Sequence, residues 1–119
     1  MYSDEVLDQF EHPRNVGPIA APDAETLITN PACGDTLKLS IRLAGDRIEE
    51  IRFQAKGCVA SIACASAMTE LVRGKTVEVA RKLCREEILQ VLGGLPEASM
   101  HASHLAIEAL EAVLKGIVC

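Results

Sequence analysis

Four side chains in this 119-residue chain are candidate ligands for a metal ion or an iron–sulfur cluster. They are Cys33, Asp35, Cys58 and His101. Thiolates and imidazole suit zinc, iron and iron–sulfur clusters, whereas a carboxylate adds a harder oxygen ligand. Two sulfurs, one oxygen and one nitrogen also make a complete tetrahedral set for zinc. A metal or cluster site follows if the fold brings these four side chains together.

The elements between the two cysteines have the pattern of an antiparallel β-hairpin. Residues 36–43 alternate polar and apolar side chains, which is typical of a half-buried strand, and residues 44–46 form a turn. Residues 47–56 supply the return strand. In that strand Ile48 keeps to the apolar face only if Glu49-Glu50 introduces a β-bulge.

The hairpin predicts that the two thiols lie close together. Cys33 comes just before the first strand and Cys58 just after the second, so both fall at the open end, and Asp35 enters the same mouth. A helix is expected soon after Cys58, and the backbone dipole at a helix N-terminus favours thiolate. The alternatives are two buried structural thiols and, for an aspartate that follows glycine, a turn cap.

The remaining donor is His101, at the start of the last expected helix. At about 100° per residue it lies at the edge of the apolar stripe beside Leu105, where it can face inward. Capping of the helix start is the alternative. His104 lies among charged residues, one turn before Glu108, and is interpreted as solvated or Glu-paired. Its alternative role is a replacement ligand that swings over the mouth.

The remaining patterns predict one α+β domain over residues 1–119, in which helices pack on one face of a small antiparallel three-stranded sheet. The third strand is residues 25–30. Helices are expected at 3–10, at 61–72, at 77–92 as one helix or two short ones, and at 101–115.

Composition narrows the classes of function. With 17 acidic against 12 basic residues and three aromatic side chains (Tyr2, Phe10 and Phe53), the chain lacks the features of a nucleic-acid-binding protein. No apolar run has the length of a membrane span, and no signal peptide is visible, so a cytoplasmic protein without membrane contact is expected. The five cysteines lack the spacing typical of a disulfide-bonded domain, which favours metal or sulfur chemistry over disulfides.

Several motifs, in order, resemble the IscU-type and NifU N-terminal iron–sulfur cluster scaffolds, whose fold is described as SufE/NifU-like. The resemblance covers nearly the whole chain. Its motifs are YS at 2–3, EHPRNVG at 11–17, NPACGD at 30–35, GC at 57–58, GKT at 74–76 and a late histidine at a helix start.

This resemblance implies a scaffold rather than an enzyme. A cysteine desulfurase would deliver persulfide sulfur, iron would bind nearby, and a transient [2Fe-2S] cluster would pass to iron–sulfur acceptor proteins. Association into a homo-oligomer is left open. The positions that match the family's ligands are Cys33, Asp35, Cys58 and His101, and zinc is an alternative occupant of the same set.

The chain departs from the family at three places. The family has a third cysteine directly after the histidine, whereas this chain has Ala102, which helix phase directs to the centre of the buried face. The family's LPPVK, which resembles a binding signal for an Hsp70-type chaperone, is LPEAS at 95–99, so chaperone contact is not supported. Cys64 is an addition, interpreted as a buried small apolar residue, with a sulfur relay as the alternative.

The missing thiol leaves two further functions open. One is a sulfur-acceptor protein that stimulates a desulfurase through one persulfidated cysteine. That acceptor must be Cys33 or Cys58, and the helix-start position favours Cys58. The other is an interaction module in which zinc is structural, so that a chelator would unfold it.

Overall fold

The fold is built on the predicted hairpin. A computed structural model describes residues 2–31 and 34–117. In it β2 (Thr36–Ala44) and β3 (Arg47–Lys56) pair antiparallel, and β1 (Ala24–Thr29) pairs antiparallel with β2, giving the order β1-β2-β3. The predicted α+β class with a three-stranded antiparallel sheet is therefore confirmed.

The predicted bulge is present at the turn end of the hairpin. Arg42 pairs with Glu50, and the next residue along β2, Leu43, pairs with Ile48, so Glu49 is the extra residue. This insertion keeps Ile48 on the same face as Ile51, and both are fully buried. At the other end Thr36, the first residue of β2, pairs with Lys56, the last residue of β3. The residues just before β2 therefore lie opposite those just after β3.

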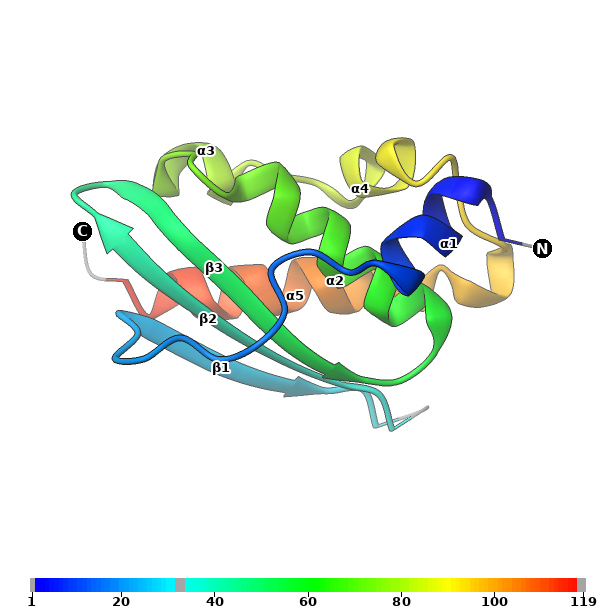
Figure 1. Ribbon diagram of the computed structural model, residues 1–119, viewed down its shortest axis with the longest axis horizontal. Coiled ribbons are helices and arrows are strands. Elements are labelled where there is room, and N and C mark those ends of the chain that lie inside the picture. The colour runs from blue at the N-terminus through cyan, green and yellow to red at the C-terminus, as the bar shows by residue number, and fades with distance from the viewer. Residues whose placement is uncertain (1, 32–33, 118–119) are drawn as a thin grey trace.

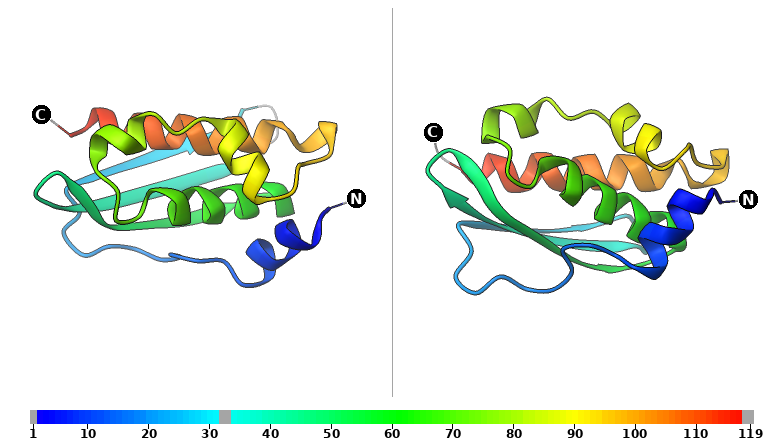
Figure 2. Two further views of the ribbon diagram at one scale, coloured as in Figure 1. Left: turned by 90° about the horizontal axis from the view of Figure 1, so that it is seen from above. Right: turned by 45° about the horizontal axis from the view of Figure 1, so that its top comes forward.

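The helices cover one face of the sheet (Figure 1). α2 packs on β3, α5 packs on β1 and β2, and the short helices α3 and α4 form an outer layer (Figure 2). Residues 77–92 form two helices, which was one of the two alternatives, and the last helix has the predicted bounds. The helices are α1 (Asp4–Glu11), α2 (Val59–Val72), α3 (Val77–Arg81), α4 (Arg85–Val91), a 3-10 turn (Glu97–Ser99) and α5 (His101–Lys115).

α2 is buried on nearly all sides. The sheet, α1, α4 and α5 all contact it, so Ala63, Ala67 and Met68 are each fully buried. Alanine allows the helix to approach the sheet closely and favours helix formation. None of the helices in the described ranges is long and apolar enough to cross a membrane.

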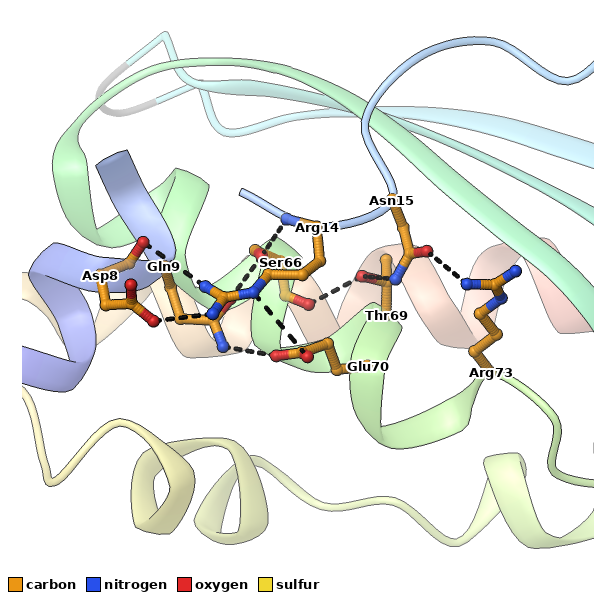
Figure 3. A network of polar contacts seen from close by, with 8 residues as sticks. All are labelled: Asp8, Gln9, Arg14, Asn15, Ser66, Thr69, Glu70 and Arg73. Carbon is orange, nitrogen blue, oxygen red and sulfur yellow. Dashed lines mark hydrogen bonds and ion pairs between the residues drawn. The ribbon is translucent and has the colours of Figure 1, made fainter. Parts of the chain in front are cut away.

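A polar network fastens the segment that follows α1 onto α2 (Figure 3). The backbone N–H of Arg14 donates to the Ser66 hydroxyl at 2.8 Å, and that hydroxyl donates to Gln9 Oε1 at 2.5 Å. The Asn15 amide donates to the Thr69 hydroxyl at 3.1 Å. On the other side of the segment, the backbone N–H of Phe53 in β3 donates to the Asn15 carbonyl, and the N–H of Gly17 donates to the Phe53 carbonyl, both at 2.9 Å. The EHPRNVG motif thus joins α2 to the edge of the sheet.

Ser66→Ala is expected to destabilise the fold by about 1–3 kcal/mol. The change leaves Gln9 Oε1 and the Arg14 N–H without the partner that Ser66 provides, and unsatisfied buried groups cost about this much. Urea unfolding would measure the loss. A change below about 0.5 kcal/mol, the size of an ordinary surface substitution, would contradict a structural role for the network.

Candidate metal centre

Three of the four predicted ligands converge at the open end of the hairpin. Asp35 directly precedes β2, and Cys58 follows β3 and occupies the N-cap position of α2 without a capping hydrogen bond from its side chain. His101 is the first residue of α5, which packs across β1 and β2. The register of the hairpin and the docking of α5 therefore bring together residues that are far apart in the sequence. Cys33 lies outside the described residues, so its approach to the other three remains a prediction.

The spacing of these side chains suits one metal ion. Asp35 Oδ2 lies 3.8 Å from Cys58 Sγ and 3.8 Å from His101 Nε2. One ligand atom from each residue lies within 4.8 Å of the other two. Ligand atoms around tetrahedral zinc are about 3.3–3.8 Å apart, because each is about 2.0–2.3 Å from the ion. A small contraction would give coordinating geometry.

The centre is closed on one side and open on the other. Asp35 is only 6% exposed, whereas the His101 side chain is 37% exposed and Cys58 is half-buried. Beside His101 lies a hollow of about 210 Å³, also lined by Asn30 and His104. A ligand or partner can thus reach the centre from the His101 side. His104 itself is exposed, as its charged surroundings predicted.

Two residues that support Asp35 were missed by the sequence analysis. Ser61 is 4% exposed, and its hydroxyl donates to Asp35 Oδ2 at 2.5 Å and lies 3.3 Å from Cys58 Sγ. Gly57 lies against the same carboxyl group, since a Cβ there would be 2.6 Å from Asp35 Cγ. Real Cβ atoms do not approach other atoms so closely, so only glycine fits without a shift. The sequence signals were the glycine before Cys58 and a hydroxyl one helical turn after it.

Ala102 occupies the position where the resemblance expects a third thiol. It is 1% exposed and belongs to the hydrophobic core, so the predicted inward direction is correct. Its methyl group offers no ligand atom. Among described residues, the only group of three or more histidine, cysteine or acidic side chains with metal-binding spacing is Asp35, Cys58 and His101.

The other described cysteines differ from Cys58. Cys64 is fully buried in α2, and burial, with a smaller contribution from the nearby charge of Cys58, raises the pKa of its thiol to about 12. A thiol with this pKa is almost entirely protonated at neutral pH, which favours the apolar role over a sulfur relay. Cys84 is exposed at the start of α4 and donates to Glu87 Oε1 at 3.4 Å.

Residues 1–117 match the model of the family described as NifU-like N terminal domain. The chain is 48% identical over 110 residues to the iron-sulfur cluster assembly scaffold protein IscU 1 of Archaeoglobus fulgidus, covering 92% of this chain and 72% of that protein. It is 41% identical over 121 residues to the nitrogen fixation protein NifU of Nostoc sp., covering 95% of this chain and 40% of that protein.

Solved structures share the fold. The N-terminal part of a NifU-like protein from Brucella abortus superimposes with a TM-score of 0.74 at 19% identity, covering 97% of this chain and 92% of that one. A crystal structure from Fervidobacterium islandicum gives a TM-score of 0.81 at 22% identity, covering 95% and 96%. These likenesses establish the arrangement of the sheet and helices.

Proposed function

The chain belongs to the NifU-like N-terminal domain family, and from this premise we propose that it is a scaffold on which iron–sulfur clusters are assembled and from which they are transferred. In this proposal residues 1–119 are a single domain of that family, whose model matches residues 1–117. The protein would bind and release its cargo without catalysing a reaction of its own, so it is not an enzyme in the usual sense.

The observation that carries the proposal is the convergence of Asp35, Cys58 and His101 at one end of the hairpin. We add Cys33, two residues before Asp35, as the fourth ligand, because its place in the sequence, just before the first strand of the hairpin, predicts that it enters the same mouth. A sulfur pair suits iron and sulfide, whereas the carboxylate is a harder donor. Such a mixed set is expected to hold a [2Fe-2S] cluster less tightly than four cysteines would, which suits a donor of clusters.

Sulfur would arrive from a cysteine desulfurase. The thiolate of Cys58 attacks the outer sulfur of the desulfurase persulfide, the S–S bond breaks, and the desulfurase thiolate leaves. This exchange needs no electrons, whereas release of sulfide from the new persulfide takes two electrons from a reductant. Cys58 is half-buried at the start of α2 and therefore reachable, unlike Cys64. Acceptor proteins in the cytoplasm would then take the cluster.

Native mass spectrometry under anaerobic conditions tests this function. The protein is weighed before and after addition of iron, cysteine and a cysteine desulfurase, and the added mass identifies the cargo. A [2Fe-2S] increment that forms only with all three additions supports the scaffold. Sulfur atoms without iron would instead identify a sulfur acceptor. Any outcome in which no cluster forms would refute the scaffold.

A zinc-stabilised interaction module is the second candidate, because the donor set also suits zinc. In that case the protein as purified carries one zinc ion, a chelator unfolds it, and the rate of the desulfurase is unaffected. If the chelated protein stays folded and then accepts a cluster, this candidate is excluded.

Ala102→Cys is expected to slow the loss of a reconstituted cluster to a chelator by roughly tenfold, since it adds a soft ligand beside His101. The decay of visible absorbance measures the rate. Ala106→Cys is the matched control, because Ala106 is equally buried one turn further along α5. If both variants lose the cluster at the parent rate, position 102 does not reach the cargo.

A further inference from the structure

We propose that Ser61 is a positioning residue of the metal centre, whose hydroxyl orients the Asp35 carboxylate toward Cys58 and His101. This inference rests on the proposed function, because it concerns how the same centre holds its metal. Neither the resemblance nor the comparisons assign a role to this serine. Its support is the set of contacts that the Ser61 hydroxyl makes inside the centre.

Ser61 reaches the centre through the geometry of α2. Cys58 is at the N-cap position, and Ser61 follows three residues later, so the two side chains lie on the same face of the first turn. The Ser61 hydroxyl is 2.5 Å from Asp35 Oδ2 and 3.3 Å from Cys58 Sγ. A single hydroxyl proton serves one strong acceptor at a time, and the shorter distance assigns it to the carboxylate.

The oxygen that Ser61 contacts is the one placed for metal binding. Asp35 Oδ2 is also the atom that lies 3.8 Å from both Cys58 Sγ and His101 Nε2. A carboxylate oxygen can accept more than one contact, so a hydrogen bond from Ser61 is compatible with binding of an ion to the same atom. Gly57 lies against the same carboxyl group. The carboxylate is thus held between a backbone surface and a hydroxyl donor.

This arrangement predicts a measurable effect on metal affinity. Groups that hydrogen-bond a ligand and fix its orientation typically contribute 10- to 100-fold to metal affinity. Ser61 is 4% exposed, so solvent does not readily replace its hydroxyl. Ser61→Ala adds no volume and keeps helix propensity, so the variant is expected to fold.

Cobalt(II) is the probe, because its visible absorption reports both binding and ligand geometry. Titration of chelator-treated protein is expected to give a dissociation constant about 10- to 100-fold higher for Ser61→Ala than for the parent, with altered d–d bands. In an Asp35→Ala background the same substitution is expected to change the constant less than about twofold. That double-mutant cycle isolates action through the carboxylate.

Ser66→Ala is the matched control. Ser66 is also a buried serine of α2 that donates to a side-chain oxygen, but its partner is Gln9 in the polar network of Figure 3. It is expected to lower stability while leaving cobalt affinity and spectrum unchanged. This comparison separates positioning of a ligand from general packing of the helix.

Three results would overturn the inference. The first is a Ser61→Ala protein that binds cobalt with parental affinity and spectrum, and the second is a loss that persists undiminished without Asp35. The third is a parent protein that binds no cobalt, which would refute the metal centre as well. Failure of cluster assembly alone, with the cobalt cycle as expected, would refute the scaffold function and leave the role of Ser61 standing.

Discussion

Cys58→Ser is expected to abolish retention of an iron–sulfur cluster, lowering cluster content more than about 100-fold. Groups that only hydrogen-bond a metal ligand already contribute 10- to 100-fold to metal affinity, and Cys58 is proposed as a ligand itself. Serine is nearly the same size but offers a protonated, hard oxygen in place of a soft thiolate. Within the described ranges, its loss leaves Asp35 and His101 without a third convergent donor.

The measurement is iron and acid-labile sulfide per chain after anaerobic reconstitution. Cys84→Ser is the matched control, because the exposed thiol of Cys84 pairs with Glu87 at the start of α4 and takes no part in the centre. That variant is expected to match the parent. A Cys58→Ser protein with the parental cluster content would refute the site, and a loss in both variants would point to general thiol damage.

Gly57→Ala is expected to weaken cobalt binding as strongly as removal of the Asp35 carboxylate, by at least about tenfold. A new Cβ would lie 2.6 Å from Asp35 Cγ and 2.7 Å from Oδ1. The backbone at Gly57 is fixed between the end of β3 and the start of α2, so the aspartate side chain must move. Overpacking of this kind also costs about 1–3 kcal/mol of stability.

Cobalt titration alongside urea unfolding separates the two effects. Gly116→Ala is the control, because Gly116 has ordinary helical dihedral angles at the end of α5 and lies away from the three ligands. It is expected to leave cobalt affinity unchanged. Parental affinity in Gly57→Ala would mean that the centre does not depend on the observed position of Asp35.

The hairpin could be predicted closely because its signals are local. Alternation defines the strands, and the need to bury Ile48 as well as Ile51 demands the bulge that the structure places at Glu49. β1 begins and ends one residue earlier than predicted. The docking of these elements also follows the predicted layers, since apolar faces can pair in few ways.

The predictions were wrong where a residue that resembles a local signal, such as a helix start, instead makes a tertiary contact. The sequence placed the start of α2 at Ser61, but the structure begins the helix at Val59, with Cys58 as the cap. The hydroxyl of Ser61 instead binds Asp35, which lies 26 residues away. No single-sequence pattern could show that contact, nor the close approach of Gly57 to the same carboxyl group. The break between α3 and α4 contains neither glycine nor proline, so no local signal showed whether residues 77–92 form one helix or two.

The burial of α2 has a consequence for how this protein can evolve. The helix meets the centre at its first turn and the N-terminal segment along its second half, and its alanines are fully buried. A larger side chain at Ala63 or Ala67 would displace a neighbour on one side or the other. Selection therefore has little freedom along this helix, and adaptation to new partners must come from the outer surfaces of α3, α4 and the sheet.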